Sequence, residues 1–424
     1  MNGFPLIAAL ITLAALFSFI NYRWLKLPTT IGLMALALTV SLGIIVAGEF
    51  FPAVEKKAEE IILRIDFNEA LMHGMLGFLL FAGALHVNLG DLKSHRFEIA
   101  ILSTLGVLIS TVLVGVLFWG VTWLLGIPMQ FIYCLLFGAL ISPTDPIAVM
   151  GILKQIGAPK SLEIKIAGES LFNDGVGVVV FMGLYEIAVG EQGFDVGHLG
   201  LLFLQEAVGG ALFGLAIGYL AYWMLKQVDN FQVEILISLA VVAGGYAFGE
   251  FLHVSAPIAM VVAGLLIGNV GKEFAMSDMT AEHLDMFWEL VDEFLNAVLF
   301  VLIGLEMVVV AFDGSRLFAG LLMIPLVLFA RLVSVGLPMS WMRSRRQFSP
   351  YAVRILTWGG LRGGISVALA LSLPTVVQNQ PVVERESILA VTYIIVIFSI
   401  LVQGLTIGRL VALSTKPTPT APNT

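Results

Sequence analysis

The fold of this chain is decided by residues 130–152, QFIYCLLFGALISPTDPIAVMGI, an apolar run that is interrupted in its middle. The interruption is Ser142–Pro146, which combines two prolines with an aspartate and two hydroxyl side chains. Residues 130–141 alone would give about 18 Å of helix, which is too short to cross a membrane. An ordinary loop at 142–146 is the alternative. The pattern favours a membrane helix broken into two halves, because apolar sequence continues on both sides of the interruption.

A second break of the same kind lies in the apolar run 351–374. Its middle, Trp358–Gly364, reads WGGLRGG, and glycine is a poor helix former. Non-helical backbone at membrane depth is tolerated only where it is buried in protein or lines a cavity. A pair of interrupted spans is also the best indication in a sequence of a transporter's binding site. We therefore predict that the two breaks cross at such a site.

The composition of the whole chain agrees with a membrane location. Of its 424 residues, 59% are hydrophobic and only 12% are charged. Soluble domains have about 45–50% apolar and about 25% charged residues, so a soluble globular enzyme is excluded. Because roughly 20 apolar residues cross a bilayer, this composition provides for about a dozen crossings. We predict an all-α polytopic membrane protein that contacts lipid.

Other classes of function find little support in the residues. The net charge of −8 comes with no basic block, so nucleic acid is not an expected partner. The single cysteine, Cys134, allows neither an internal disulfide nor a cysteine-based metal site. The His-Glu-x-x-His and Gly-x-Ser-x-Gly motifs of hydrolases are missing. We expect no enzyme activity, no covalent substrate and no cofactor.

About thirteen apolar segments are long enough, or nearly so, to cross the membrane. They lie at 4–21, 29–48, 68–87, 98–125, 130–152, 162–189, 199–225, 232–252, 257–271, 287–311, 317–342, 351–374 and 386–412. Two charged stretches, 54–66 and 272–286, fit surface helices better. The loops that follow odd-numbered spans carry most of the lysines and arginines, which predicts an outside N-terminus and a cytoplasmic C-terminus.

The positions of the two breaks predict an internal repeat. They fall in the fifth and twelfth spans, which are an odd number of spans apart and therefore run in opposite directions. We predict two inverted six-helix repeats, residues 1–190 and 231–413, joined by a linking span at 191–230. The halves share no visible sequence identity, so the repeat rests on the breaks and the parity alone. The tail, residues 414–424, is rich in threonine and proline and is expected to be disordered.

Five charged residues stand out inside the predicted spans, where a charge costs about 2.5–3.5 kcal/mol at the helix centre and is a functional candidate. They are Asp145, Glu169, Asp174, Arg331 and Arg362. In the sixth span, Glu169 and Asn173, and likewise Ser170 and Asp174, are four residues apart and share one helical face. A helix end facing cytoplasmic water is the alternative for Glu169. Apolar sequence follows Asp174 directly, which places it deeper.

The breaks suggest roles for the other three charges. Asp145 precedes Pro146, a pattern typical of a helix cap with proline in the first helical position, at the positive end of a half-helix. A purely structural cap is the alternative. Arg362 lies where the carbonyl end of a half-helix would favour a cation, and cancelling that dipole is an equally open role. Arg331 is expected to pair with Glu169.

Three acids against two arginines leave one carboxylate without a counter-charge. That carboxylate can hold either one proton or one monovalent cation. We therefore hypothesise that the two ions compete for one site and exchange one for one. Oxygen ligands suit a hard cation, and Asp145, Asp174, Ser170 and the backbone carbonyl of Thr144 can supply them.

These motifs resemble those of the NhaP-type sodium/proton antiporters in the first monovalent cation:proton antiporter family, which includes the animal exchangers. The matching segments are Ser142–Pro146, Gly168–Gly175, Phe329–Arg331 and Gly359–Gly363, with weaker similarity at Phe78–Leu89 and Leu302–Leu305. They span nearly the whole chain in order and coincide with the broken spans.

The resemblance implies a homodimeric, thirteen-span exchanger of a prokaryotic cell or inner membrane, with a dimerisation domain and a moving core domain. By analogy Asp145, Asp174, Ser170 and Thr144 bind sodium or a proton. The other polar residues of the motifs, Glu169, Asn173, Arg331 and Arg362, structure the site. The Asn173-Asp174 pair goes with electroneutral exchange in the family. Where relatives often carry an acid in the third span, this chain has Asn88, so that span is left out of the site.

Two alternatives remain open. The first is a potassium/proton antiporter of the same fold, because the same oxygens serve sodium, lithium and potassium. The second is a cation channel. A carbonyl filter motif of the Thr-Val-Gly-Tyr-Gly kind is missing, and paired broken helices favour alternating access.

Overall fold

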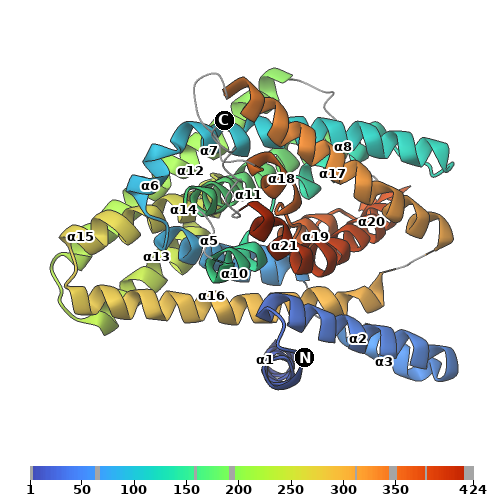
Figure 1. Cartoon of the computed structure of the whole chain (residues 1–424), viewed down its shortest axis with the longest axis horizontal. Coiled ribbons are helices and arrows are strands. Elements are labelled where there is room, and N and C mark those ends of the chain that lie inside the picture. The colour runs from blue at the N-terminus through green and yellow to red at the C-terminus, as the bar shows by residue number, and fades with distance from the viewer. Residues whose placement is uncertain are drawn as a thin grey trace, which may run out of the picture.

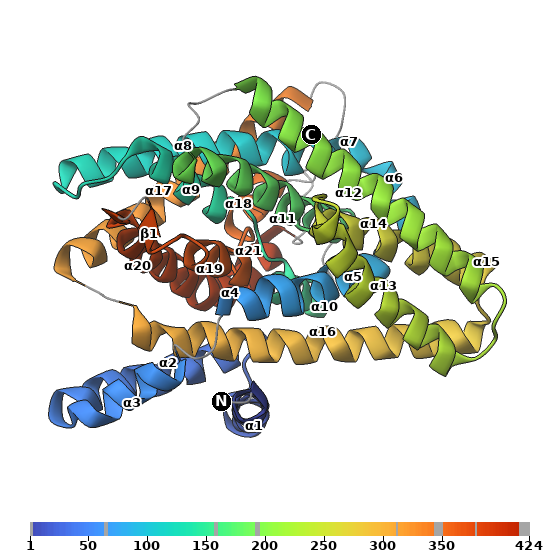
Figure 2. The same ribbon diagram turned by 180° about the vertical axis from the view of Figure 1, so that it is seen from behind.

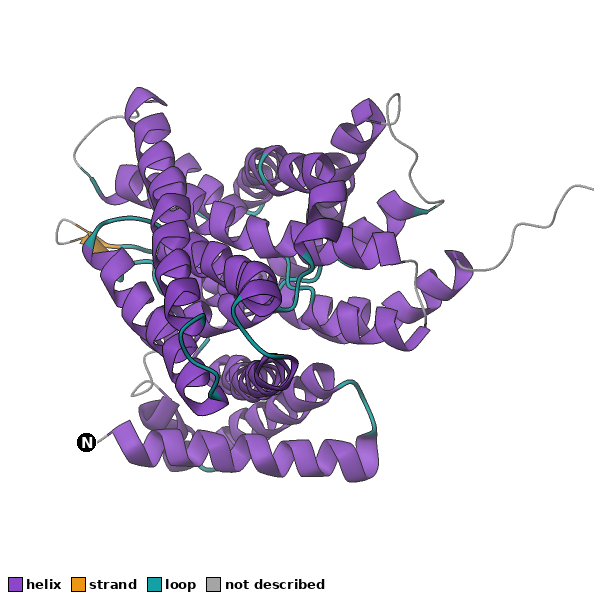
Figure 3. Ribbon diagram, turned by 90° about the vertical axis from the view of Figure 1, so that its left-hand side faces the viewer, coloured by secondary structure: helices purple, strands orange, loops and turns teal. Residues whose placement is uncertain are grey.

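The computed structural model is almost entirely helical (Figure 3). It describes residues 3–62, 67–156, 160–190, 196–310, 313–342, 351–377 and 380–414. A short antiparallel pair, β1 (Val376–Val377) with β2 (Gln380–Pro381), is the strand structure of this described part. Residues 415–424 of the predicted disordered tail lie outside it.

The helices of the first half of the chain end with the long α11. They are α1 (Gly3–Ile20), α2 (Thr29–Phe50), α3 (Pro52–Ile62), α4 (Phe67–Glu69), α5 (Leu76–Leu85), α6 (Leu89–Ser94), α7 (Arg96–Ser103), α8 (Leu105–Leu124), α9 (Phe131–Ile141), α10 (Ile147–Ile156) and α11 (Lys160–Val189). The π-helical turns η1 (Asn21–Leu25) and η2 (Ala70–Met75) extend α1 and precede α5.

The second half begins with another long helix, α12. Its helices are α12 (Val196–Leu225), α13 (Phe231–Phe251), α14 (Ala256–Leu266), α15 (Lys272–Phe274), α16 (Asp278–Glu306), α17 (Gly314–Met342), α18 (Ala352–Trp358), α19 (Gly364–Leu371), α20 (Glu384–Phe398) and α21 (Gly404–Ser414). Between them lie the turns η3 (Ile267–Gly271), η4 (Met307–Val309) and η5 (Ser399–Gln403).

The number of crossings agrees with the sequence. Ten helical stretches of the described chain are long and apolar enough to span a bilayer. The broken pairs α9/α10 and α18/α19, together with the charged helix α16, account for the remaining three of the thirteen predicted spans. The fold is therefore that of an all-α polytopic membrane protein.

The start of the tenth span differs from the prediction. Residues 272–286 were expected to form a separate surface helix, but α16 begins at Asp278 and runs without interruption to Glu306. Only α15 and the turn after it lie before this helix. The hydropathy of a sequence falls where charged residues begin, so a predicted span ends there. The backbone hydrogen bonds of a helix do not depend on side-chain charge and continue past that point. The charged residues of 278–286 are therefore part of the same continuous helix as the apolar residues of the predicted tenth span.

The broken helices lie in the middle of the molecule. In Figures 1 and 2, α10, α18, α19 and α21 occupy the centre, with α8 and α17 along one side and α16 along the other. The N-terminal helices α1, α2 and α3 lie beyond α16 in both views. Helix α16 thus lies between the N-terminal helices and the centre in both views, although α2 also reaches the centre, where Ile31 packs against Gly404 of α21.

Small residues allow α16 to approach α2 closely. A Cβ added to Gly304 would overlap Ala37, so only glycine fits at this contact. The Ser41 hydroxyl donates a hydrogen bond of 2.8 Å to the Gly304 carbonyl across the same interface. Close backbone approach and hydroxyl–carbonyl bonds are typical of helix packing in membranes. They fix the position of α16 beside the central breaks.

Candidate functional site

The two breaks are held against each other by a backbone hydrogen bond. Asp145 N donates to Leu361 O at 2.8 Å, and the two residues form an antiparallel bridge. Ser142–Pro146 therefore lies against Gly359–Gly363, and the two chain segments run in opposite directions there. The predicted crossing of the broken helices is present.

The Asp145 carboxylate lies at the first turn of α10. Its Oδ1 accepts a hydrogen bond of 2.9 Å from Ile147 N, and Met150 N bonds to Pro146 O at 2.7 Å. This is the expected helix cap with proline at the start. Asp145 is partly buried, and its carboxylate lies at the positive end of the half-helix.

The middle of α11 places four polar side chains in the protein interior. The exposed fractions of Glu169, Ser170, Asn173 and Asp174 are 1%, 2%, 0% and 9%. The alternative of a water-facing helix end for Glu169 is thus wrong. A helix with this much buried polarity is stable in a membrane only when the polar groups are paired or line an ion path.

Thr144 connects this helix to the first break. Asn173 Nδ2 donates to Thr144 Oγ1 at 2.8 Å, and Asn173 Oδ1 accepts from Thr144 N at 3.3 Å. The Ser170 hydroxyl donates to the Thr144 carbonyl. Asn173 and Ser170 of α11 therefore bind the backbone N–H, the carbonyl and the hydroxyl of Thr144. The Thr144 carbonyl and the Ser170 hydroxyl consequently lie together, beside Asp145 and one helical turn from Asp174.

The charges of Asp145 and Asp174 act on each other. They come from different elements, one from the cap of α10 and one from the buried face of α11. Two carboxylates in a poorly solvated site repel each other, and that repulsion is relieved when either a proton or a cation binds between them. The geometry can therefore bind one positive charge.

The two arginines are engaged elsewhere. Arg331 Nη1 of α17 pairs with Glu169 Oε1 at 2.6 Å, and both residues are buried, as expected from the sequence. Arg362 Nη1 donates to the carbonyls of Ser142 and Pro143 at 2.7 and 3.0 Å, at the end of α9. Within the described residues no carboxylate lies at ion-pair distance from Arg362. Its guanidinium caps the carbonyl end of α9, which is the dipole role left open above, and its positive charge still counts toward the total charge of the site.

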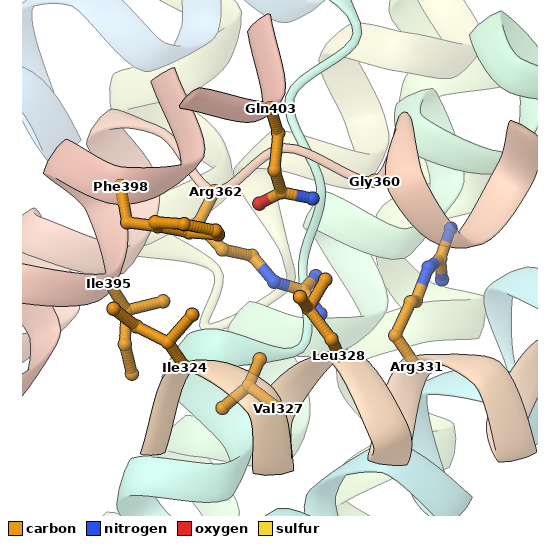
Figure 4. Close-up of a pocket in the computed structure, with 9 residues that line it drawn as sticks. All are labelled: Ile324, Val327, Leu328, Arg331, Gly360, Arg362, Ile395, Phe398 and Gln403. Carbon is orange, nitrogen blue, oxygen red and sulfur yellow. The ribbon is translucent and has the colours of Figure 1, made fainter. Parts of the chain in front are cut away.

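A small cavity lies beside the two arginines (Figure 4). It is lined by Arg331, Arg362, Gly360, Gln403 and Phe398, among others, and measures about 10 Å³. That is room for a single water molecule. Neither Asp145 nor Asp174 lines it, so this cavity is separate from the carboxylate site.

The donors at the carboxylate site suit a transported alkali ion. Carboxylate, hydroxyl and carbonyl oxygens are ligands for hard cations. Within the described chain, no group of three or more His, Cys, Asp and Glu side chains is placed to hold a metal ion.

Some residues of this region were not predicted from the sequence. The Ser399 hydroxyl accepts a hydrogen bond of 2.8 Å from Arg362 N, and Gln403 Nε2 donates to Trp358 O at 2.8 Å. Both lie in the π-helical turn η5, which supports the second break. A serine and a glutamine inside an apolar span carry only a weak signal, and their partners depend on tertiary packing.

Comparison with known proteins agrees with this site. Residues 9–413 match the family model described as "Sodium/hydrogen exchanger, transmembrane". The chain is 52% identical over 411 residues to the Na(+)/H(+) antiporter NhaP of Pseudomonas aeruginosa, covering 96% of each chain. It is 33% identical to the Na(+)/H(+) antiporter NhaH of Halobacillus dabanensis, covering 92% of each.

A solved structure has the same fold. The sodium proton antiporter MjNhaP1 of Methanocaldococcus jannaschii superimposes with a TM-score of 0.74 at 20% sequence identity, covering 97% of this chain and 98% of the other. The similarity extends over nearly the whole chain. With the family match and the sequence identity, it shows that this chain belongs to the transmembrane sodium/hydrogen exchanger family.

Proposed function

We propose that the protein is an electroneutral sodium/proton antiporter that exchanges one sodium or lithium ion for one proton. The observation that carries this proposal is the Asp145–Asp174 pair at the crossing of two broken helices, with both arginines committed to other partners. The names of the relatives, which are Na(+)/H(+) antiporters, support sodium as the cation.

The charges at the site support one-for-one exchange. Glu169 and Arg331 cancel each other. Asp145 and Asp174 against Arg362 leave one negative charge when the site is empty and none when it holds one proton or one monovalent cation. Moving a net charge through the low-dielectric membrane is costly, so loaded forms move and the empty form does not. Competition for one site then couples the two ions.

The ligands we assign are the Asp145 and Asp174 carboxylates, the Ser170 hydroxyl and the Thr144 carbonyl. Asn173 keeps Thr144 in position through its two hydrogen bonds. Glu169, Arg331 and Arg362 hold the surrounding helices. Each ligand comes from a break or from the helix that packs on it, so a small movement of the breaks changes access to all of them together.

The exchange is proposed to proceed by alternating access between inverted repeats, residues 1–190 and 231–413, with 191–230 as the linking span. The core containing α9/α10, α11, α17 and α18/α19 would move relative to α16 and the N-terminal helices. We further propose a homodimer in a prokaryotic inner membrane, with the N-terminus outside and the C-terminus cytoplasmic.

The test is a flux assay in proteoliposomes with an imposed pH gradient. Sodium, lithium or potassium is added outside, and lumenal pH is recorded with the membrane voltage clamped and unclamped. We expect sodium-evoked proton movement that is independent of voltage and is lost in Asp174→Asn. We also expect the apparent KM for sodium to rise about tenfold per pH unit below the pH at which the site protonates, since one proton competes with one cation.

Four results would count against the proposal. Proton movement that follows voltage would refute one-for-one exchange, and full activity in Asp174→Asn would move the site away from α11. A response to potassium alone would favour the potassium antiporter. Flux that does not saturate and needs no opposing gradient would indicate a channel. Glu163→Gln, on the first turn of α11, is the matched control for loss of an acidic side chain from the same helix.

A further inference from the structure

Acidic side chains recur along one face of α16. They are spaced by three or four residues from the start of the helix to its middle, and the series ends in an asparagine. Its members are Asp278, Glu282, Asp285, Glu289, Asp292 and Asn296. At 100° per residue these positions fall within a narrow stripe. Glu289, Asp292 and Asn296 lie within the predicted tenth span, where charged side chains are costly unless they serve an ion path.

The stripe begins at an open cavity of about 540 Å³. Asp278, Glu282 and Asp285 line this cavity together with Asn88 and Lys272. The Lys272 ammonium pairs with Asp285. The other acidic side chains of the stripe therefore keep their negative charge uncancelled by this lysine. From the predicted orientation of the chain, this opening faces the cytoplasm.

The stripe ends beside the ion site. The next residue on the same face, Leu299, packs on Gly364, where an added Cβ would come within 2.8 Å of Leu299 Cδ1. A Cβ on the neighbouring Gly363 would lie 2.5 Å from Asp145 Oδ2. Asn296 is therefore about one helical turn from Leu299, which packs beside the residue that contacts Asp145. The charges of Asp292 and Asp145 also act on each other.

Asn296 has an unused ligand atom. Its side chain is only 3% exposed, and Nδ2 donates to Asp292 O at 2.8 Å and to Asp292 Oδ1 at 3.1 Å. Within the described residues its Oδ1 has no hydrogen-bond partner. Buried amide oxygens are normally satisfied, so an orphaned one next to a carboxylate indicates a missing ligand. A carboxylate oxygen and an amide oxygen can both coordinate the same cation.

We propose that Asp292 and Asn296 form a second cation station, which holds a partly hydrated sodium ion between the cytoplasmic opening and the Asp145–Asp174 site. The inference rests on the proposed sodium/proton exchange. A sodium ion that enters from the cytoplasmic opening would replace part of its hydration shell with oxygens of these two side chains before it reaches the Asp145–Asp174 site. The station adds no charge to the moving site, so exchange stays one for one.

Thallium(I), a monovalent cation with strong anomalous scattering, is the probe for this station. Crystals of the full-length protein soaked in thallium(I) acetate at alkaline pH should show two peaks, one at Asp145–Asp174 and one at Asp292–Asn296. Asp292→Asn and Asn296→Leu should each lose the second peak and keep the first. Asp174→Asn should lose the first and keep the second. Glu293→Gln removes an exposed charge from the adjacent position of the same helix and should keep both.

One peak, at Asp145–Asp174 only, would overturn the station and leave the proposed function intact. Loss of both peaks in Asp292→Asn with retention of the folded structure would mean that the two positions form a single site, which also overturns it. Failure of the proposed function has a different signature, because wild-type proteoliposomes would then show no sodium-evoked proton movement. The two failures are therefore distinguishable.

Discussion

The Glu169–Arg331 pair determines what charge the ion site can have. Its two groups meet at 2.6 Å in the interior, so neither is available to Asp145 or Asp174. The pairing was predictable from the sequence, because an arginine inside a membrane span requires a carboxylate and the sixth span offered one beside the site. The Glu169–Arg331 pair is therefore structural. It affects transport only indirectly, because it contributes no net charge to the ion site.

Breaking this pair should destabilise the protein strongly. In Arg331→Met, Glu169 is left as a buried and unpaired charge, and such changes cost about 3–5 kcal/mol. We expect a large fall in the thermal unfolding midpoint in detergent, measured by intrinsic fluorescence. The double variant Glu169→Leu, Arg331→Met removes both charges and should recover most of the loss. A double variant as unstable as the single one would contradict the pairing.

Other buried charges escaped the sequence analysis. Glu234 and Glu306 are 0% and 5% exposed, yet they lie at the first turn of α13 and at the last residue of α16. A charge at a predicted helix end is normally assigned to the water interface, so the hydropathy pattern gave no reason to bury them. Their burial depends on neighbouring helices that cover the ends.

The two broken helices were predictable as elements, because proline and glycine interrupt apolar runs that are otherwise long enough to cross. Their crossing followed from the parity of the spans. The continuity of α16 was not predictable, since its first turns are as charged as a surface helix. The repeat boundaries at 190 and 231 stay predictions, as does the assignment of ligands to the site.

At Gly363 the second broken element approaches the Asp145 side chain closely. An added Cβ would lie 2.5 Å from Asp145 Oδ2 and 2.8 Å from Asp145 Cβ, so one side must shift. We expect Gly363→Ala to lower the saturated exchange rate at least about tenfold by displacing the carboxylate, because ligand positions matter on the scale of 1 Å.

The measurement is sodium-evoked proton flux in proteoliposomes at matched protein content, with size-exclusion chromatography to confirm folding. Gly151→Ala on α10 is the control, because nothing lies within 4 Å of an added Cβ there. Equal activity of the two variants would show that the contact at Gly363 has no effect on the site.

At the scale of the whole molecule, the distribution of basic residues predicts which face is cytoplasmic. Asp313 lies at an exposed position before α17, and Glu273 lies at an exposed position after α14. With the buried Cys134 replaced by alanine, Asp313→Cys should react with a membrane-impermeant maleimide on intact cells. Glu273→Cys should react only after the membrane is opened. The reverse pattern would invert the orientation.

The hydrogen bonds between Arg362 and the end of α9 join positions 220 residues apart in the chain. At a synthesis rate of about 5–20 residues per second, the second break leaves the ribosome roughly 10 to 45 seconds after the first. During that interval the α9 carbonyls and Asp145 are in the membrane without their partners. Premature release of the nascent chain would therefore leave an incompletely paired helix, which is a substrate for quality-control proteolysis rather than a partly active exchanger.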